Sequence, residues 1–221
     1  MLLVLRISYC LVDFVLFIVP IRDAERAHTG KGIWDEPFED FDDEGRKKIL
    51  GYASWNDPDS HVYKDRMTIV RHKDTKEIVA AAGGFFYPEC TISKSMPGMS
   101  RAVRHFNPQY DEESSLKIWD KLDYLDECFP DLDYENSWMI EAVYTDPRHR
   151  GHGIARHLIS YLLGKGKSLG YTKALISCAI GNEGARRVYE KCGYVLVGQG
   201  HSEKSLEKIG SPGFYILRKD L

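Results

Sequence analysis

The sequence lacks the residue patterns that mark most metal sites and disulfide frameworks. Its five cysteines are odd in number and widely spaced, and no two of them form a C-x-x-C pair. Its eight histidines show no H-E-x-x-H spacing. These absences predict reduced thiols in an intracellular protein that has neither a structural nor a catalytic metal.

An excess of charge of one sign is also missing. The 30 Lys and Arg residues nearly balance the 33 Asp and Glu residues, which gives a formal net charge of -3. Because binding to a phosphate backbone requires clustered basic surface, we expect no nucleic-acid partner. The chain has 221 residues, of which 43% are hydrophobic and 29% are charged. This composition is typical of a globular protein and predicts a single domain over residues 1–221.

A long apolar run without charges is absent as well, although the N-terminus comes close to one. Leu2 to Val19 is almost continuously apolar, but Arg6 and Asp13 interrupt it. Each charge would cost roughly 2.5 to 3.5 kcal/mol at the centre of a membrane helix. We therefore expect a cytoplasmic protein with no membrane partner, in which a strand at Leu3 to Tyr9 precedes a buried helix ending near Pro20. A membrane anchor and a mis-assigned start are the competing interpretations.

The middle of the chain predicts a hairpin followed by a less regular segment. His61 to Arg71 and Glu77 to Phe86 are rich in Val, Ile, Tyr and Phe, and the polar residues 73–76 separate them. This pattern indicates two antiparallel strands. Pro88 to Pro108 is rich in turn residues, and we expect it to be irregular. Asp111 to Glu127 carries apolar residues at helical spacing and predicts a helix.

The most informative segment is a strand, a glycine turn and a helix in direct succession. Trp138 to Thr145 has the β-branched and aromatic character of a strand. The turn Arg148-His149-Arg150-Gly151-His152-Gly153 follows, and apolar residues from Ile154 to Leu163 then recur at helical spacing. The first turn of a helix leaves N–H groups unpaired, in the field of roughly +0.5 charge. The two glycines would let this backbone close on a diphosphate, so the segment predicts an anion site.

Two other nucleotide-binding motifs fail on the same residues. A dinucleotide fingerprint requires a third glycine or alanine where this chain has Arg156. Gly166-Lys167-Ser168 matches the end of a Walker loop, but the first glycine of that loop would fall on Tyr161. We interpret this second segment as the basic C-terminus of a helix.

The pattern R-x-x-G-x-G after a strand that ends in V-x-x-D-P resembles the GNAT superfamily of acyl-CoA N-acyltransferases. Downstream, Ala174 to Ile180 is typical of a buried strand, and Asn182 is placed to cap the next helix. The order N-x-x-A-x-x-x-Y-x-x-x-G-Y is similar to the second half of the family's signature. It is formed by Asn182, Ala185, Tyr189, Gly193 and Tyr194. The two motifs span Trp138 to about Gly200, whereas residues 1–136 support the resemblance only loosely.

The resemblance implies an α/β fold of the mixed α+β kind. A twisted, mostly antiparallel mixed sheet would be flanked by helices, with a splayed central pair formed by the motif strand and Ala174 to Ile180. The pantetheine arm of acetyl-CoA would enter between these two strands, and Gly213 to Arg218 would close the sheet. Residues from about Tyr87 to Tyr134 would form an insertion that serves as a wall or lid of the acceptor site.

The resemblance also implies a coenzyme site made mostly of main chain. The backbone of Val143 and Thr145 would pair with pantetheine, Arg148 and the N–H groups that follow it would hold the pyrophosphate, and Asn182 would contact the arm. The full set of expected cofactor-binding residues is Val143, Thr145, Arg148, Arg150, Gly151, His152, Gly153, Ile154, Ala155, Asn182 and Ala185. His149 and His152 are expected to be surface residues on the coenzyme side rather than bases.

Attack of an amine on a thioester needs a base and a proton donor. A primary amine with a reference pKa of about 10 is protonated at neutral pH, and the leaving thiolate has a reference pKa of about 8.5. We predict Glu141 as the base and Tyr189 as the acid. A solvated strand residue and a core aromatic are the respective alternatives. Cys178 and Cys192 are expected to be small buried hydrophobes.

These expectations define an N-acyltransferase that moves an acetyl group from acetyl-CoA to a primary amine by direct attack in a ternary complex. A non-catalytic acyl-CoA-binding module of the same fold is the competing hypothesis. The acceptor would be a small-molecule amine or a peptide amine. The acidic C-terminal half of the insertion is compatible with a cationic acceptor, but such runs are usually solvated helix faces.

Overall fold

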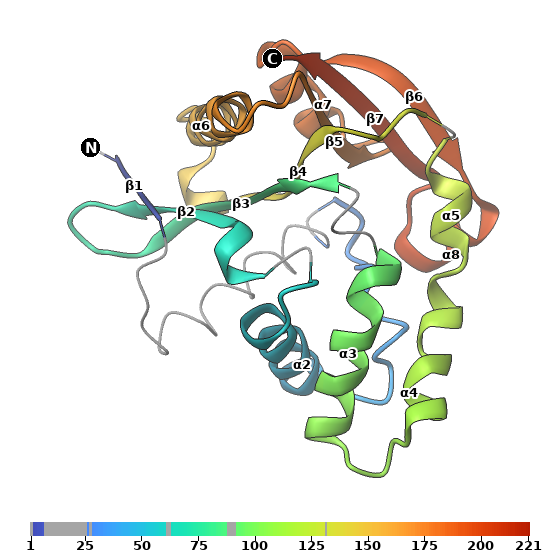
Figure 1. Cartoon of the computed structure of the whole chain (residues 1–221). Helices are drawn as coiled ribbons and strands as arrows, with labels where there is room; N and C mark the ends of the chain where they lie inside the picture. The colour runs from blue at the N-terminus through green and yellow to red at the C-terminus, as the bar shows by residue number, and fades with distance from the viewer. Residues whose placement is uncertain (1, 7–25, 27, 61–62, 88–91, 131) are drawn as a thin grey trace.

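The part of the chain that the structure describes folds around one seven-stranded sheet (Figure 1). This computed structural model describes residues 2–6, 26, 28–60, 63–87, 92–130 and 132–221. The strands are β1 (Leu2–Arg6), β2 (Met67–His72), β3 (Ile78–Phe86), β4 (Ser137–Thr145), β5 (Lys173–Ala179), β6 (Val195–His201) and β7 (Gly213–Asp220). They lie in the order β1-β2-β3-β4-β5-β7-β6, and every neighbouring pair except the parallel β4–β5 pair is antiparallel. The expected mixed, mostly antiparallel sheet is confirmed.

Helices cover both faces of this sheet (Figure 1). The α-helices are α2 (Asp43–Asn56), α3 (Ile92–Phe106), α4 (Glu112–Lys117), α5 (Tyr124–Cys128), α6 (Ile154–Ser168), α7 (Glu183–Lys191) and α8 (Glu203–Ile209). Helices α6 and α7 pack on one face, which we call the α6 face, and the other five lie on the opposite α3 face. The 3-10 helices η1 (Lys64–Arg66), η3 (Trp119–Leu122) and η4 (Pro147–His149) lie in the connections.

Strand β4 shows how the sequence divides its side chains between these faces. Successive side chains of a strand point to opposite sides of the sheet. Trp138 and Ile140 accordingly pack in the cluster around α6, whereas Met139 lies in a separate cluster on the α3 face. All three are almost completely buried, as a central strand with helices on both faces requires.

The N-terminal strand and the hairpin lie at one edge of the sheet. The expected strand near the N-terminus is β1, and the expected helix that ends near Pro20 lies outside the described residues. The hairpin is β2 and β3, although β2 begins only at Met67, because η1 precedes it. Among the helices that the structure describes, none is long and apolar enough to cross a membrane.

The segment Pro88 to Pro108 was predicted to be irregular, and this prediction was wrong. It contains the 15-residue helix α3, with Pro97 inside it. Pro97 and Gly98 are strong helix breakers in isolation, but tertiary packing overrides their propensities. Buried residues at helical spacing, Met99, Ala102 and Val103, face the same cluster as α2. Gly98 is needed for close contact, because a Cβ atom there would lie 1.3 Å from Asp57 Oδ2.

The predicted helix from Asp111 to Glu127 is confirmed as helical but is broken into α4, η3 and α5. Asp111 caps α4 by accepting a hydrogen bond from Ser114 N at 2.7 Å. Trp119, Leu122 and Leu125 are buried in the α3-face core, as their spacing predicted, whereas Leu116, which belongs to the same predicted stripe, is exposed. The segment between β3 and β4 thus contains three α-helices that pack under the sheet.

Two glycines of β6 let this segment approach the sheet closely. A Cβ atom at Gly200 would lie 2.3 Å from the backbone of Cys128, and one at Gly198 would lie 2.9 Å from Pro130.

The edge of the sheet differs from the prediction, in which Gly213 to Arg218 would close the sheet. Gly213 to Arg218 does join the sheet, but as part of β7 it lies between β5 and β6, so that β6 forms the edge.

Candidate active site

The glycine turn joins β4 to α6 in the predicted order of strand, turn and helix. Gly151 and Gly153 both have a left-handed backbone, with φ of 83° and 74°. A Cβ atom at Gly151 would meet nothing within 4 Å, so the requirement for glycine there comes from its φ angle and not from crowding. Gly153 is the N-cap of α6.

A row of N–H donors surrounds these two glycines. His157 N donates to Gly153 O at 3.1 Å, which is the first hydrogen bond of α6. The N–H groups of Ile154, Ala155 and Arg156 belong to the first turn, which has no intrahelical acceptor. Those of residues 151–153 have no acceptor within the described part of the chain. With the dipole of a 15-residue helix behind it, this row is suited to an anion.

Two arginines of the turn are held by the end of β4. Arg148 donates from Nε and Nη2 to the Asp146 carboxylate at 3.1 and 2.8 Å, and its backbone N donates to the same carboxylate at 2.8 Å. These contacts hold the pKa of Asp146 down at about 2. Arg150 donates from Nε to Thr145 O at 3.2 Å. His149 is half-buried beside Asp146, with Nδ1 3.7 Å from a carboxylate oxygen.

Strands β4 and β5 separate next to this turn. They pair over four residues, from Ser137 with Lys173 to Ile140 with Ile176. Beyond these pairs, β4 continues along β3 as far as Thr145, and β5 continues along β7 as far as Ala179. The predicted splayed pair is therefore present. From residue 141 onward, no described strand pairs with the β5-side edge of β4, which we call the open edge.

A bulge lies at the point of separation. The register between β3 and β4 shifts at this point, and Ala142 has a left-handed φ of 53°. Further along, Asp146 N donates to Val79 O on β3 at 2.9 Å. Because successive N–H groups of a strand point to opposite edges, those of Thr145 and Val143 point toward the open edge. These are the two residues that were predicted to pair with pantetheine.

Glu141 lies at the start of the open edge, on the α3 face. It shares this face with Met139, two residues earlier in the strand. Its side chain is half-buried, and this burial raises its pKa to about 7. A carboxyl group with this pKa is largely ionised just above neutral pH and can accept a proton there.

Tyr189 lies on the opposite α6 face. It is 5% exposed, its ring centroid is 6.5 Å from that of Tyr194, and burial raises the pKa of its phenol well above the ordinary value. The hydroxyl is therefore neutral at physiological pH and makes no hydrogen bond to the described residues. Burial also raises the pKa of both neighbouring thiols, to about 12 for Cys178, which keeps them as unreactive thiols.

Asn182 starts α7 as the sequence predicted. Its side-chain oxygen accepts a hydrogen bond from Ala185 N at 3.1 Å. No sequence pattern indicated the neighbour of this cap, His28. A Cβ atom at Gly181 would lie 3.1 Å from His28 Nε2, so the imidazole covers the residue before Asn182. These residues are more than 150 positions apart, and no local pattern links them.

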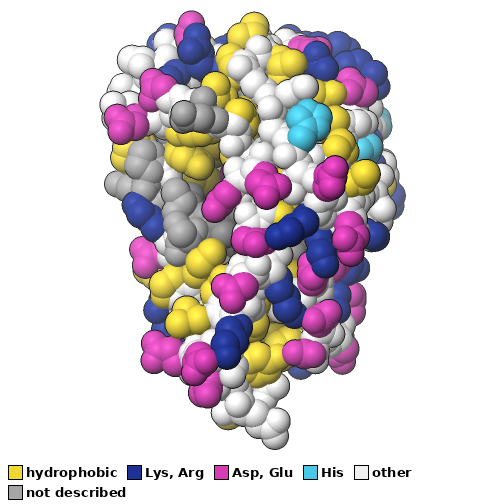
Figure 2. Space-filling view, turned by 90° about the vertical axis from the view of Figure 1, so that its right-hand side faces the viewer, with side chains coloured by type: hydrophobic (Ala, Val, Ile, Leu, Met, Phe, Trp, Pro, Cys, Tyr) yellow, Lys and Arg dark blue, Asp and Glu magenta, His cyan; other side chains and the backbone are white. Residues whose placement is uncertain are grey.

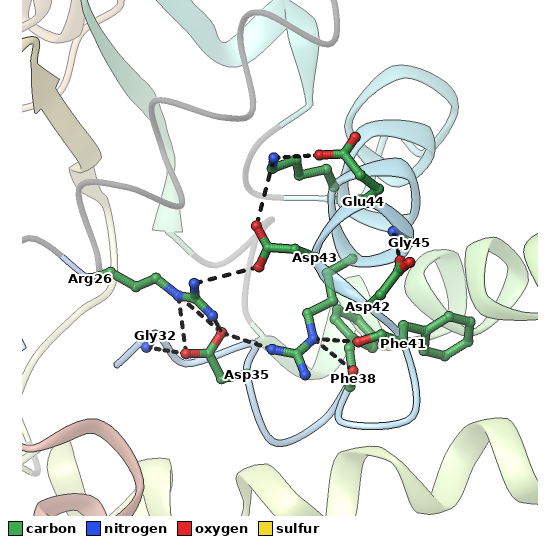
Figure 3. A network of polar contacts seen from close by, with 11 residues as sticks. Arg26, Gly32, Asp35, Phe38, Phe41, Asp42, Asp43, Glu44 and Gly45 are labelled. Carbon is green, nitrogen blue, oxygen red and sulfur yellow. Dashed lines mark hydrogen bonds and ion pairs between the residues drawn. The ribbon is translucent and has the colours of Figure 1, made fainter. Parts of the chain in front are cut away.

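An ionic network fixes the segment that carries His28 (Figure 3). Asp35 accepts hydrogen bonds from Arg26 Nε at 3.1 Å and from Arg46 Nη1 at 3.4 Å. Arg46 also donates from Nε to Phe38 O at 2.8 Å. The segment before α2 is thus tied to α2 itself.

The acidic half of the insertion is not a patch of one charge. Figure 2 shows acidic and basic side chains interspersed over the side of the molecule that carries α5 and α8. Asp123 pairs with Lys204 at 3.2 Å, and Glu113 pairs with Lys117 at 2.8 Å. Within the described residues, no group of three or more His, Cys, Asp or Glu side chains could hold a metal ion.

Comparisons with known proteins agree with this geometry. The model of the Acetyltransferase (GNAT) family matches residues 31–194. The fold is similar to that of an N-acetyltransferase from Staphylococcus aureus Mu50, with a TM-score of 0.64 at 13% identity, over 98% of this chain and 100% of that one. No curated protein matches the sequence.

Two further solved structures differ in the acceptor that their names give. One is the ribosomal-protein-alanine N-acetyltransferase of Brucella melitensis, with a TM-score of 0.53 at 14% identity over 99% of both chains. The other is an apo agmatine N-acetyltransferase, with a TM-score of 0.53 at 15% identity over 100% of this chain and 99% of that one. At such identities the likeness concerns the fold and leaves the acceptor open.

Proposed function

The chain belongs to the acetyltransferase (GNAT) family, and we propose that it transfers an acetyl group from acetyl-CoA to a primary amine by direct attack in a ternary complex. The observation that carries this proposal is the junction of β4 with the glycine turn. There, a row of unpaired N–H groups lies at the end of a strand that has separated from its parallel neighbour.

The proposed coenzyme site uses the residues that the sequence predicted. The N–H groups from Gly151 to Ala155 would bind the pyrophosphate, whereas the predicted N–H of Arg150 donates to Pro147 O at 3.4 Å. The open backbone of Val143 and Thr145 would pair with the pantetheine arm. Arg148 commits Nε and Nη2 to Asp146, which leaves its Nη1 group for a phosphate oxygen. Asn182 and Ala185, at the start of α7, would contact the arm from the other side.

The proposed chemistry divides between the two faces of the sheet. Glu141, on the α3 face, would take the proton from the ammonium group, and its pKa of about 7 suits it to this task near neutral pH. The amine nitrogen then forms a bond to the thioester carbon, and the N–H of Val143 is our candidate donor to the resulting oxyanion.

Tyr189, on the α6 face, would act on the leaving group. As the carbon–sulfur bond breaks, its neutral hydroxyl would donate a hydrogen bond to the thiolate, and the second proton that the attacking nitrogen sheds would end on the sulfur to give free CoA. Its raised pKa makes the hydrogen bond the larger part of this role, because the phenol is a weaker acid than a thiol with a reference pKa of about 8.5.

We further propose that the described parts of residues 87–134 form a fixed wall of the acceptor site within one domain. The close contacts of Gly200 with Cys128 and of Gly98 with Asp57 support a fixed wall rather than a mobile lid. The free cysteines of the described residues, Cys128, Cys178 and Cys192, agree with the proposed cytoplasmic location. The acceptor would be a small-molecule amine or a peptide amine.

A calorimetric titration with CoA and a thiol-release screen with acetyl-CoA together test this function. We expect saturable CoA binding, and release of CoA with at least one amine from a panel of polyamines, aminoglycosides, arylalkylamines, amino acids and peptides. Absence of CoA binding by folded protein would contradict the coenzyme site. Binding without thiol release from any amine would instead identify a non-catalytic acyl-CoA-binding module.

A further inference from the structure

We propose that the acceptor is an arylalkylamine, whose ring binds to an aromatic wall next to Glu141 on the α3 face. This inference rests on the proposed function, because it names the acceptor class of the same site. The aromatic wall consists of Phe85, Tyr87, Phe129, Tyr134 and Phe214.

Separate segments of the chain contribute these five rings. Phe85 belongs to β3, Tyr87 follows it, Phe129 follows α5, and Phe214 belongs to β7. The rings surround the buried side chains of Met139, Leu175 and Ile216. Tyr87 and Tyr134 have ring centroids 5.1 Å apart, and Phe129 and Phe214 stack at 5.5 Å with an interplanar angle of 14°. Apart from the buried Phe85, the rings are half-buried and keep surface for a ligand.

The wall is continuous with the proposed base. Phe85 lies opposite Met139 in the β3–β4 register, and Gly83 lies opposite Glu141. Along β4, Glu141 is therefore the next residue on this face after Met139, which the rings surround. On the other side of the separation, Phe214 is paired with Ala179 at the splayed end of β5. Aromatic surface thus reaches the open strands from both sides.

A hollow extends from this surface. It has a volume of about 380 Å³, and Tyr87, Leu132 and Tyr134 form its apolar lining, with Asp133 and Glu135 at its polar rim. This volume is within the range of sites for small molecules, roughly 300 to 1,000 Å³. Aromatic rings bury much apolar area and pair favourably with another ring, so a ligand with an aryl group gains the most here.

The charges near the wall favour an acceptor with a single cation. Asp133 is paired with Lys173 at 2.5 Å, and Glu135 and Asp126 are exposed to water. Glu141 and Asp126 are near enough to Tyr87 to help burial raise its pKa, and of these two Glu141 is half-buried and Asp126 is exposed. One ammonium group can therefore meet Glu141, whereas a second cation in the hollow would find Asp133 already paired with Lys173 and Glu135 exposed to water, where an ion pair contributes little.

The test is acceptor selectivity in variants of the wall. Thiol release from acetyl-CoA is measured with 2-phenylethylamine and with putrescine, for wild type, Tyr87→Leu and Phe214→Leu. Tyr171→Leu is the matched control, because Tyr171 packs against Phe86 and Trp138 on the α6 side. We expect wild type to prefer 2-phenylethylamine by at least about tenfold in kcat/KM, a factor typical of a well-filled apolar pocket.

Both wall variants should lower this preference by about tenfold, whereas Tyr171→Leu should retain it. The KM for acetyl-CoA and the calorimetric affinity for CoA should stay unchanged in the wall variants, which separates loss of the wall from misfolding. Turnover of putrescine or an alanyl peptide in preference to 2-phenylethylamine would overturn the acceptor class and leave the acetyltransferase intact. An unchanged preference in folded wall variants would also overturn it. Absence of turnover with every amine would remove both proposals.

Discussion

The carboxylate of Asp146 holds Arg148 by three hydrogen bonds, two to the guanidinium and one to the backbone, at 2.8 to 3.1 Å. The residue that ends β4 therefore also fixes the first residues of the glycine turn. It caps η4 and orients the turn that carries the proposed anion-binding N–H groups.

This relationship predicts that Asp146 supports coenzyme binding without taking part in the chemistry. Asp146→Ala should weaken CoA binding by roughly five- to tenfold, equivalent to one or two lost hydrogen bonds, and leave kcat nearly unchanged. Asp146→Asn keeps the acceptor for the Arg148 backbone N–H and should lose less. Calorimetry with CoA measures the effect, and an unaltered affinity in Asp146→Ala would show that the turn holds its shape alone.

Glu141 predicts a pH-dependent activity. The base must be ionised, so kcat/KM should rise with pH through an apparent pKa of about 7. Glu141→Gln should lower kcat by about 10²- to 10⁴-fold and remove this rise of kcat/KM with pH. Glu127→Gln alters an exposed carboxylate on α5 and serves as the control. A pH profile shared by wild type and Glu141→Gln would exclude Glu141 as the base.

The same carboxyl group predicts that stability falls as pH rises, whereas activity rises. Its pKa is raised on folding from its ordinary value of 4.5 to about 7, so the folded state favours the neutral form. The free energy of unfolding should therefore fall as pH rises from about 4.5 to about 7. Glu141→Gln should lack this decrease. Denaturant titrations of the two proteins at pH 5 and pH 8 measure it, and equal pH dependence would contradict the burial of the carboxyl group.

Two neighbouring tyrosines allow a matched test of the proposed acid. Tyr189→Phe should lower kcat by about 10² or more, with little change in the KM for acetyl-CoA. Tyr194→Phe removes a buried hydroxyl that lacks a hydrogen-bond partner in the described structure, so activity should persist and stability should not fall. Similar kcat values for the two variants would mean that Tyr189 is only a core aromatic.

Two glycines of α6 test the packing of the helix on β4. A Cβ atom at Gly166 would lie 2.6 Å from the Trp138 ring, whereas one at Gly164 would meet nothing within 4 Å. Gly166→Ala should destabilise the fold by about 1 to 3 kcal/mol through overpacking. Gly164→Ala should stabilise it by about 0.5 to 1 kcal/mol through its better helix propensity. Equal midpoints in denaturant would refute the contact with Trp138.

The C-terminal half of the fold could be predicted from the sequence because its signals are local. The strand Trp138 to Thr145, the turn with Gly151 and Gly153, and the cap at Asn182 each follow from neighbouring residues. Their order also carries the family signature. The same segments form β4, the turn and α7 in the structure.

The features that escaped prediction depend on contacts between distant residues. Helix α3 forms despite Pro97 because Gly98 can pack against Asp57, which lies 41 positions earlier. The position of β7 between β5 and β6 depends on pairing across the sheet. The aromatic wall joins Phe85 to Phe214, and His28 reaches Gly181, although neither pair is close in sequence.

The four residue pairs between β4 and β5 are the seam that joins the two parts of the described sheet. A pantetheine arm bound beside Val143 would form hydrogen bonds to the part of β4 that β5 leaves unpaired. Bound coenzyme would then stabilise the junction between the two parts of the sheet. The protein should melt at a higher temperature and resist proteases longer as the CoA concentration increases.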